Sequence, residues 1–257
     1  MDTCRVLIDP EPMPGSWNMA VDEALLESAI ERQTCILRLY RWSEATLTLG
    51  YFQQENAARR DPRLASLPAV RRLSGGGAIL HHHEITYSCA IPPNHPLAAD
   101  PLQLYDRVHE RIVALLNAYG VPAVLRGQAI RSGEEPFLCF GRGDPRDIIL
   151  HGQKILGSAQ RRRRGAVLQH GSLLLSRSPH APEFPGIAEL VPHAILPDRL
   201  TAELAAPVAH LLALSQAPSI LCPAERDRVH CLQLDRYSTL GRGPRVRDAA
   251  LNANDRR

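Results

Sequence analysis

One basic residue in this chain differs in type from all the others. Of the 30 lysine and arginine residues, only Lys154 is a lysine. A guanidinium is permanently charged and spread over a planar fork, whereas an ammonium is a compact donor whose pKa shifts readily on burial. A site that needs a small cationic head therefore cannot use arginine instead. Lys154 is therefore predicted to have a chemical role. The alternative is that this one lysine occurs by chance in an arginine-rich sequence and has no special role.

A cysteine precedes this lysine at a spacing that allows the two to meet. Cys139 lies in the apolar sequence PFLCF, and the 15 residues to Lys154 are enough to cross to a neighbouring strand and return. A cation within a few ångströms lowers the pKa of a thiol and favours the nucleophilic thiolate. An isolated cysteine is otherwise most often a buried structural residue. The pair predicts a thiolate nucleophile if the fold brings the two residues together.

A triple glycine forms the second candidate site. The sequence RRLSGGGAIL covers residues 71–80. Glycines let the backbone approach a ligand and aim N–H groups at an anion or a carbonyl, and Arg72 could bind a carboxylate or a phosphate. Three glycines are also common in turns that bind nothing. The spacing matches neither GxGxxG nor GxxxxGK[ST], which argues against a Rossmann or P-loop nucleotide site.

Several histidines lie near these motifs. His81, His82, His83 and Glu84 are consecutive, and adjacent residues of a strand point to opposite faces, so they are not expected to bind one metal ion. We expect one of the three histidines to line a cleft and the others to be solvated. His170 could accept a proton from an incoming amine, although a single histidine in a strand is more often structural.

Composition and charge are those of an ordinary globular protein. The chain has 257 residues, 44% hydrophobic and 22% charged, with a formal net charge of +3, too weak to indicate a nucleic-acid partner. No segment approaches the roughly 18 apolar residues of a membrane span, and the N-terminus lacks a signal-peptide pattern. The six cysteines have no paired short spacings, which indicates reduced thiols. We expect a cytoplasmic protein.

The elements that must position these residues alternate irregularly between helix and strand. This favours an α+β (α/β) fold with mixed, largely antiparallel sheets flanked by helices. The expected helices are Trp17 to Arg32, Leu102 to Tyr119 and Leu200 to Leu214. The expected strands are Cys4 to Asp9, a hairpin-like pair CILRLYRW and ATLTLGYF, Val70, Ile85 to Ile91, and the meander FLCF, DIILHG, KILGSAQ and AVLQHGSLLL, with turns at Gly152 and Arg161 to Gly165.

The end of the chain differs in composition from the rest. From Leu240 onward the sequence is rich in Arg, Asp, Gly and Asn and has little apolar content, which is typical of a frayed tail. We therefore expect a catalytic domain over residues 1–240 and a polar, disordered tail over residues 241–257.

Three motifs, in this order, resemble those of the biotin/lipoate protein ligase superfamily, most closely its lipoate ligases and cysteine-dependent octanoyltransferases. They are SWNMAVDEALLES, RRLSGGGAILHHHEITYS and GQKILGSAQRRRRGAVLQHGSLLL, and the resemblance spans roughly Val6 to Leu175. It implies a domain in which the glycine turn and the lysine-bearing strand embrace a medium-length acyl chain, with Lys154 as the family lysine. The substrate-binding residues expected from the motifs and the resemblance are Arg72, Gly75, Gly76, Gly77, Ala78, Ile79, Leu80, Gly157, Ser158 and Ala159.

The resemblance leaves two branches open. Ligases activate free lipoate with ATP and magnesium, whereas one group of octanoyltransferases takes octanoate from acyl carrier protein through a cysteine thioester. ITYS and the cysteine before the lysine strand look like the transferases, and the intact GGGA looks like the ligases. A ligase typically has a C-terminal accessory domain, and about 40 residues after Leu214 are too few for one of usual size. We favour the transferase, which needs no cofactor or metal.

The transferase reading assigns a role to each motif. Cys139 would accept the octanoyl group from octanoyl-acyl carrier protein and pass it to a lysine of a lipoyl carrier domain, such as the glycine cleavage H protein or a 2-oxoacid dehydrogenase E2. Lys154 would stabilise the thiolate, and the N–H groups of Gly76 and Gly77 would hold developing negative charge. The run Arg161 to Arg164 is either a solvated hairpin tip or a dock for acidic carriers.

Other readings remain open beside the transferase. They are an ATP-dependent lipoate-protein ligase, an enzyme that moves octanoyl or lipoyl groups between lipoyl carrier proteins, and a catalytically silent acyl-binding protein. The presence of both Cys139 and Lys154 argues against the silent protein.

Overall fold

The structure, a computed structural model, describes residues 3–54, 61–129, 136–193 and 197–238. Its centre is an eight-stranded sheet with the order β11-β1-β2-β6-β10-β9-β8-β7. In this sheet β1 runs parallel to β2 and β11, and the other neighbouring pairs are antiparallel. The strands are β1 (Thr3–Ile8), β2 (Cys35–Tyr40), β6 (Glu84–Ile91), β7 (Ala123–Leu125), β8 (Ile148–Leu150), β9 (Gln153–Arg163), β10 (Ala166–Leu174) and β11 (Ser215–Pro218).

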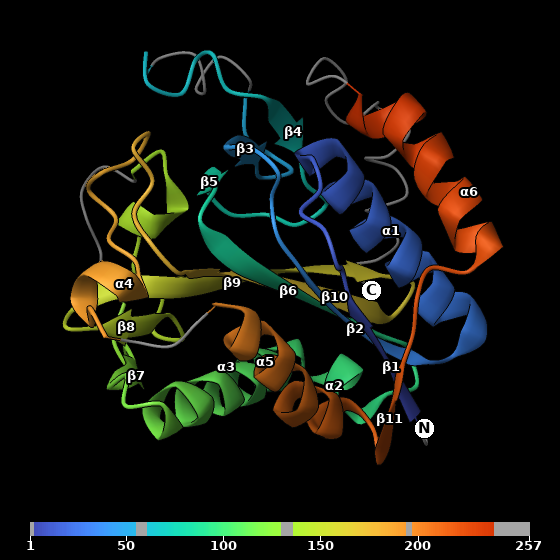
Figure 1. Ribbon diagram of the computed structural model, residues 1–257. Coiled ribbons are helices and arrows are strands. Elements are labelled where there is room, and N and C mark those ends of the chain that lie inside the picture. The colour runs from blue at the N-terminus through green and yellow to red at the C-terminus, as the bar shows by residue number, and fades with distance from the viewer. Residues whose placement is uncertain (1–2, 55–60, 130–135, 194–196, 239–257) are drawn as a thin grey trace.

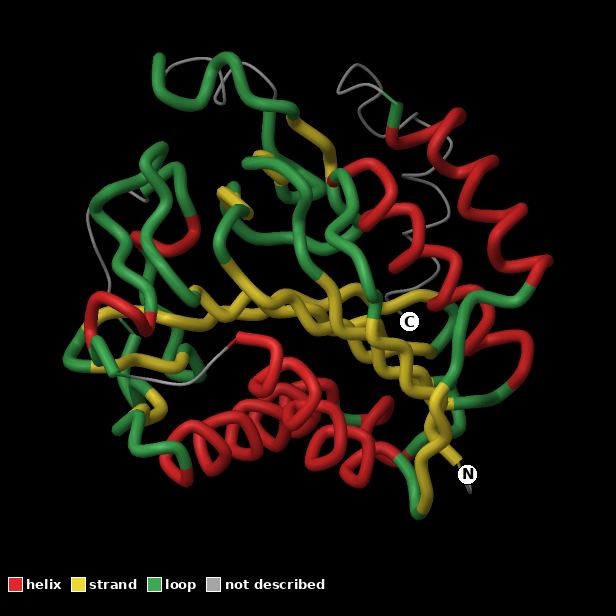
Figure 2. The backbone as a smooth tube through the Cα atoms, in the orientation of Figure 1, coloured by secondary structure: helices red, strands yellow, loops and turns green. Residues whose placement is uncertain are grey.

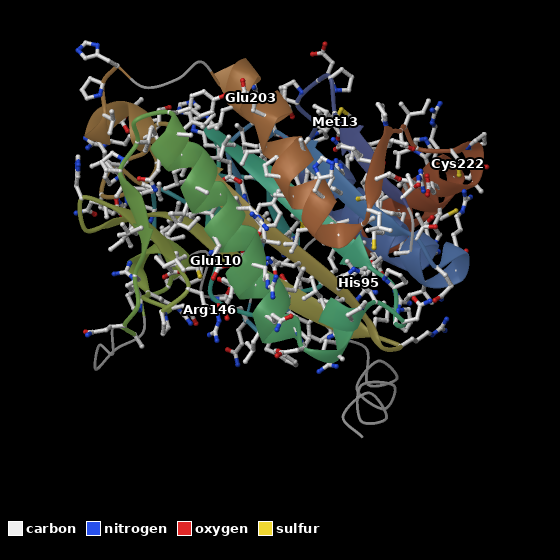
Figure 3. All side chains as sticks on the ribbon, turned by 90° about the horizontal axis from the view of Figure 1, so that it is seen from below. Met13, His95, Glu110, Arg146, Glu203 and Cys222 are labelled. Carbon is white, nitrogen blue, oxygen red and sulfur yellow. The ribbon has the colours of Figure 1, made fainter. Side chains whose placement is uncertain are left out.

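Helices cover both faces of the large sheet (Figure 1). One face carries α1 (Gly15–Arg32) and α6 (Pro223–Leu232), and the opposite face carries α3 (Pro101–Ala118) and α5 (Pro197–Leu212). Seen from below, α3 with Glu110 and α5 with Glu203 cross that face side by side (Figure 3). The remaining short helical segments are α2 (Pro96–Ala99), η2 (Cys139–Gly141), α4 (Ile187–Leu190) and η3 (Gln233–Tyr237).

A second, three-stranded sheet lies on the α1 side of the large one (Figure 2). Its order is β4-β3-β5, with β4 (Ala69–Arg71) parallel and β5 (Ile79–His81) antiparallel to β3 (Thr46–Leu49). The glycine turn is the connection between β4 and β5. This small sheet therefore holds the glycine turn above the central strands of the large sheet.

Local sequence explains the main elements. In α3 the apolar residues Leu104, Val108, Ile112 and Leu116 recur every fourth position and are buried against the sheet, and Asp100 caps the helix through its carboxylate. All nine residues of β10 are buried. A strand covered on both faces has no side that faces solvent, which is why β10 lacks a simple alternation of apolar and polar residues and buries Gln169, His170 and Ser172 as well.

The structure confirms the expected α+β fold and corrects three local predictions. The strands β2 and β3 do not form a hairpin, because the intervening Trp42 is buried and its Nε1 donates to Thr86 Oγ1 over 2.8 Å, so the chain leaves one sheet and enters the other. The sequence FLCF is not a strand: Leu138 forms a single bridge with Ala78, and a 3₁₀ turn begins at Cys139.

The third correction concerns the arginine run. Arg161 to Arg163 belong to β9, and the turn consists of Arg164 and Gly165, both with positive φ. The turn at Gly152, also with positive φ, is as expected. The expected tail from Leu240 onward and the domain boundary at residue 240 lie outside the described residues. Within the described part of the chain, no helix is long and apolar enough to cross a membrane.

Candidate active site

The hairpin of β8 and β9 places Lys154 inside the protein. One extra residue in β9 shifts the register between its pairs with Ile148 and Ile149, directly after Lys154. The side chain is 5% exposed. It lies across Gly157, where an added Cβ would be 2.5 Å from the lysine Cε. The small residue at 157 thus makes room for the lysine itself, rather than for a ligand as the sequence suggested.

The ammonium of Lys154 lies between a carboxylate and the Cys139 segment. Its Nζ is 2.9 Å from Asp147 Oδ1 and donates to the Cys139 carbonyl oxygen over 3.3 Å. It also lies 5.4 Å from the centre of the Phe140 ring. Burial raises the pKa of Asp147, and the lysine charge opposes this rise. Asp147 therefore fixes the lysine head beside Cys139, a role that sequence reasoning did not assign.

Cys139 is held next to the glycine turn by backbone hydrogen bonds. Its N–H donates to the Ala78 carbonyl over 2.7 Å, and the Ala78 N–H donates to the Phe137 carbonyl over 3.1 Å. The half-buried Cys139 side chain packs against a cluster of Ile79, Phe140 and Leu174. The structure thus brings the predicted cysteine and lysine together. The contact it shows is to the cysteine backbone, and the effect on the thiol stays a prediction.

Arg72 shapes the glycine turn from within. Its buried guanidinium donates to Ser74 Oγ (3.1 Å), to the Thr48 carbonyl (3.1 Å) and to the carbonyls of Gly75 (2.6 Å) and Gly77 (2.7 Å). Burial lowers the pKa of Arg72 to about 10. The contacts that the structure shows are with the turn, so direct binding of substrate by Arg72 stays a prediction.

Two further positions of the glycine turn leave no room for a side chain. Gly76 has a φ of +90°, and a Cβ on Gly77 would lie 2.8 Å from Arg142 Nε. Gly50, outside the motif, allows the Gly76 carbonyl to approach it closely. The turn is therefore defined by packing as well as by backbone freedom.

A buried chain of polar residues ties the glycine turn to α1. Ser74 Oγ lies 2.5 Å from His170 Nε2, and His170 Nδ1 lies 3.1 Å from Asp22 Oδ2. Burial alone would raise the pKa of Asp22, but His170 and the neighbouring Arg38 outweigh it and keep the carboxylate ionised. Asp22 and Ser74 were missed as site residues. The sequence signal for them was their place within the first two of the three motifs. Asp22, Ser74 and His170 are each 7% exposed or less, which favours a structural role for His170.

The two residues after Gly157 also form contacts within the protein. Ser158 Oγ lies 2.6 Å from both Tyr87 Oη and His109 Nε2, and its backbone N–H and carbonyl both bond Tyr105 Oη. Burial lowers the pKa of His109 to about 3, so its ring is neutral. Ser158 thus has partners within the protein, and its expected contact with a ligand stays a prediction. Ala159 pairs with His170 in the ladder of β9 and β10.

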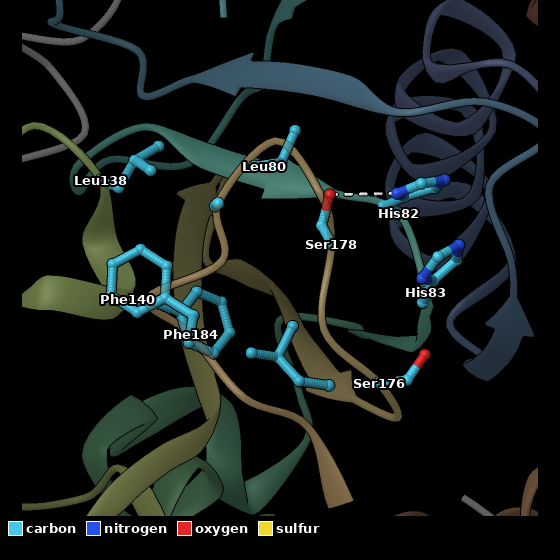
Figure 4. A pocket seen from close by; sticks show the side chains of 10 residues that line it. Leu80, His82, His83, Leu138, Phe140, Ser176, Ser178 and Phe184 are labelled. Atoms are coloured by element: carbon cyan, nitrogen blue, oxygen red, sulfur yellow. Dashed lines mark hydrogen bonds between the residues drawn. The ribbon is translucent and has the colours of Figure 1, made fainter. Parts of the chain in front are cut away.

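Two cavities lie on opposite faces of β5. The first has about 240 Å³ of empty space, counted with its opening to solvent, and is bordered mainly by apolar atoms; because it is somewhat less open than the second, it is called the enclosed cavity, and it is lined by Met19, Tyr40, Arg72, Ile79, His81, Thr86, His170, Gly171 and Ser172. The second, of about 370 Å³, is more open and is shown in Figure 4; it is lined by Leu80, His82, His83, Leu138, Phe140, Leu174, Ser176, Ser178, Ala181 and Phe184. Successive strand residues point to opposite faces, so Ile79 and Leu80 line different cavities.

The three consecutive histidines have different surroundings. His81 is buried and hydrogen-bonds with Glu84 and Thr48. His82 is half-buried and His83 is exposed, and the centres of these two stacked rings are 3.6 Å apart. His82 and His83 both line the open pocket, so the expectation of one cleft histidine and two solvated ones is wrong. Among the described residues, no group of three or more His, Cys, Asp or Glu side chains is placed to hold a metal ion.

The fold and this arrangement of residues have relatives among known protein families. Residues 14–219 match the family described as the lipoyl protein ligase A/B catalytic domain. The chain belongs to this family. The resemblance seen in the three motifs is thereby confirmed.

Relatives named octanoyltransferase LipM are similar over most of this chain. That of Moorella thermoacetica is 39% identical over 176 residues, 66% of this chain and 64% of the relative. That of Carboxydothermus hydrogenoformans is 35% identical over 179 residues, 68% of this chain and 66% of the relative. The chain thus spans a little under two thirds of the length of these relatives.

Solved structures of lipoate ligases share the fold. A lipoate-protein ligase A bound with ATP has a TM-score of 0.71 and 22% identity, covering 93% of this chain and 97% of that one. A bipartite lipoate protein ligase from Thermoplasma acidophilum, described with its E2 lipoyl domain, has a TM-score of 0.66 and 18% identity, covering 93% and 95%. At these identities the likeness shows the fold alone.

Proposed function

We propose that this protein transfers an octanoyl group from octanoyl-acyl carrier protein to a lysine of a lipoyl carrier domain, through a thioester on Cys139. The observation that carries the proposal is the meeting of Cys139, the only lysine of the chain and the glycine turn, with Leu138 and Phe140 in the wall of the open pocket and Ile79 in that of the enclosed cavity. Relatives named octanoyltransferase support the same class of reaction. The reaction needs neither ATP nor metal, because one thioester replaces another.

The enclosed cavity is the proposed site of the acyl chain. Its lining is mostly apolar, and it shares Ile79 with the cluster against which Cys139 packs. Burying a methylene group is favourable by about 0.8 kcal/mol, so a medium-length chain gains substantially from such a cavity. An octanoyl chain that enters it would leave its carbonyl carbon near Cys139.

Lys154 and the glycine turn are proposed to stabilise the charge that develops on this carbonyl. The Cys139 thiolate attacks the donor carbonyl carbon, and the oxygen becomes an oxyanion before the donor sulfur leaves and takes a proton. The ammonium of Lys154 is a compact donor beside the cysteine backbone. Arg72 donates to the Gly75 carbonyl oxygen. In a trans peptide the N–H of the next residue points in the opposite direction, so the Gly76 N–H points away from Arg72. There it can donate to the oxyanion.

The second half of the reaction passes the group to the acceptor. The lysine amine of the lipoyl carrier domain attacks the thioester carbonyl, the bond to Cys139 Sγ breaks, and an amide forms. The product amide is more stable than the thioester, so this step is downhill. The glycine cleavage H protein and 2-oxoacid dehydrogenase E2 domains are the proposed acceptors, and the cytoplasm is the proposed location.

The decisive experiment omits ATP and magnesium. Incubation with octanoyl-acyl carrier protein is expected to add one octanoyl group to Cys139, located by mass spectrometry of peptides and removed by hydroxylamine. Addition of an apo lipoyl domain should then move the group to its lysine. Transfer that requires ATP and free lipoate would show a lipoate-protein ligase instead, and transfer from one octanoylated or lipoylated carrier to another would show exchange between carriers.

The arginine run has fewer exposed side chains than its sequence suggests. Arg163 pairs with Glu23 and Glu27 of α1, and the Arg161 guanidinium lies 5.0 Å above the Tyr51 ring. Arg162 and Arg164 are exposed. If the run docks acidic carriers, these two exposed arginines are expected to provide most of the attraction.

Replacing both exposed arginines, Arg162→Ser with Arg164→Ser, is expected to lower kcat/KM for carrier substrates severalfold at low salt and to flatten its salt dependence, because fewer charges steer the encounter. Arg107→Ser with Arg111→Ser, an equal loss of charge on the exposed side of α3, is the matched control. An unchanged salt dependence in the Arg162/Arg164 variant would exclude docking at this turn.

A further inference from the structure

The proposed function gives the open pocket no part in holding the acyl chain, yet the pocket wall includes both chain neighbours of Cys139. Leu138 and Phe140, the neighbours of Cys139 in the chain, are both in its wall, and Leu174 belongs both to the pocket and to the cluster that packs on Cys139. The enclosed cavity lies on the other face of β5. Cys139 therefore packs against residues that line both spaces, Ile79 of the enclosed cavity and Phe140 and Leu174 of the open pocket.

A thioester donor requires two such spaces. One must hold the acyl chain on the carbonyl side of the reacting bond, and the other must hold the group attached to the donor sulfur. The second space must also be open, because the donor thiol leaves through it. The enclosed cavity fits the requirement for the acyl chain, and the open pocket fits the requirement for the group attached to the donor sulfur.

The polarity of the open pocket changes from one end to the other. Figure 4 shows Leu138, Phe140 and Phe184 on one side, and His82, His83, Ser176 and Ser178 toward the other. The apolar end is the one that contains the neighbours of Cys139. A ligand that fits would be an extended arm, apolar next to its sulfur and rich in hydrogen-bonding groups farther away.

The polar end offers hydrogen-bond donors and acceptors from histidine and serine side chains. His82 Nδ1 lies 3.0 Å from Ser178 Oγ, and partial burial lowers the pKa of His82, with His83 and His180 acting in the same direction. The His83 Nδ1 lies 3.1 Å from the Arg177 carbonyl oxygen, which only accepts, so this nitrogen carries a proton. None of the described residues that line the pocket is Asp, Glu, Lys or Arg. Such groups suit amides better than charged ligands.

We propose that the open pocket binds the pantetheine arm of the acyl donor. The arm begins with a thioester on a short apolar ethyl unit and continues through two amides, in the same order as the pocket. This proposal rests on the proposed function. In the reaction, the bond between the acyl carbon and the pantetheine sulfur breaks as the bond to Cys139 Sγ forms, and the protonated pantetheine thiol leaves through the pocket opening.

The test fills the pocket and compares donors with and without the arm. Ser176 is half-buried in the pocket wall, so Ser176→Trp can project an indole into the pocket. Acylation of Cys139 is measured by mass spectrometry with octanoyl-acyl carrier protein and octanoyl-coenzyme A, which both carry the arm, and with octanoyl-N-acetylcysteamine, which lacks most of it. The variant is expected to lose about tenfold or more in acylation efficiency, about 1.4 kcal/mol, with both arm-bearing donors and little with the truncated donor.

Controls separate the possible causes of a loss. Ser215→Trp, on the exposed edge strand β11 at the far end of the sheet, should behave as the unmodified protein with all three donors. His82→Ala with His83→Ala should raise KM for the arm-bearing donors alone, which provides a second test if the tryptophan disturbs folding. Equal slowing of all donors by Ser176→Trp, or slowing of the carrier-protein donor only, would overturn the proposal. If no donor acylates Cys139 in the unmodified protein, the proposed function itself fails.

Discussion

Replacing Cys139 by serine is expected to abolish the octanoyl adduct and to reduce carrier octanoylation by on the order of 10³-fold or more. A serine hydroxyl ionises far less readily than a thiol and would form an ester rather than a thioester. Cys139 is half-buried and makes its structural hydrogen bond through the backbone, so the fold should be retained. The adduct is measured by mass spectrometry, and the fold by circular dichroism and thermal unfolding.

The matched control for this substitution is Cys231→Ser, at an exposed position on α6. It removes a thiol without touching the site and should leave both adduct and transfer unchanged. If Cys139→Ser retains transfer in the absence of ATP, the covalent mechanism is wrong. If it retains transfer only when ATP and free lipoate are supplied, the protein is a ligase that holds an acyl-adenylate.

Replacing Lys154 by arginine is expected to leave a folded protein with roughly 10²- to 10³-fold lower kcat/KM for octanoyl transfer. The guanidinium keeps the charge that pairs with Asp147, but its planar fork is larger than an ammonium. The lysine stem passes over Gly157, where the Cε already occupies the place of a side chain. The larger head therefore cannot remain both beside Asp147 and beside the Cys139 carbonyl. Steady-state kinetics and thermal unfolding of the variant check the two parts of this prediction.

Chemical rescue of a Lys154→Ala variant tests whether the size of the cationic head group at this position matters. Lys154→Ala opens a space next to Asp147, and added ethylammonium should restore part of the activity because it reproduces the compact head. Ethylguanidinium of the same charge should restore less. Near-normal transfer by Lys154→Arg, or equal rescue by the two cations, would contradict the argument that this position requires an ammonium.

The sequence predicted most of the secondary structure because the periodicity is local. The helices at residues 15–32, 101–118 and 197–212 and the meander of β8, β9 and β10 are close to the expected bounds. The hairpin-like pairing of β2 with β3 was wrong, because sequence proximity cannot show that buried Trp42 bonds Thr86 of a distant strand and directs the chain into a second sheet. Pairing in a sheet depends on contacts that lie far apart in the chain.

The types of the reacting residues were also determined by the sequence alone. A single lysine among 30 basic residues, a cysteine 15 positions earlier and three consecutive glycines are visible without a structure. Their chemistry follows from the side chains: an ammonium, a thiol and a backbone free to turn. The order of the three motifs was sufficient to identify the family that the comparison confirmed.

Only the tertiary structure decided which partners the candidate residues have within the protein, and their contacts with substrate stay predictions. The side chain of Arg72 is of a type that can bind an anion, but its guanidinium donates hydrogen bonds to the carbonyls of its own turn. Gly157 could have made space for a ligand, but it makes space for Lys154. Asp147 gave no signal, because a carboxylate acquires a role only from the cation that the fold places beside it. Residue type limits the chemistry a side chain can perform, whereas packing determines its partner. The partners of Arg72 and Lys154 lie only a few positions away in the chain, yet they meet only because the turns between them fold back on themselves.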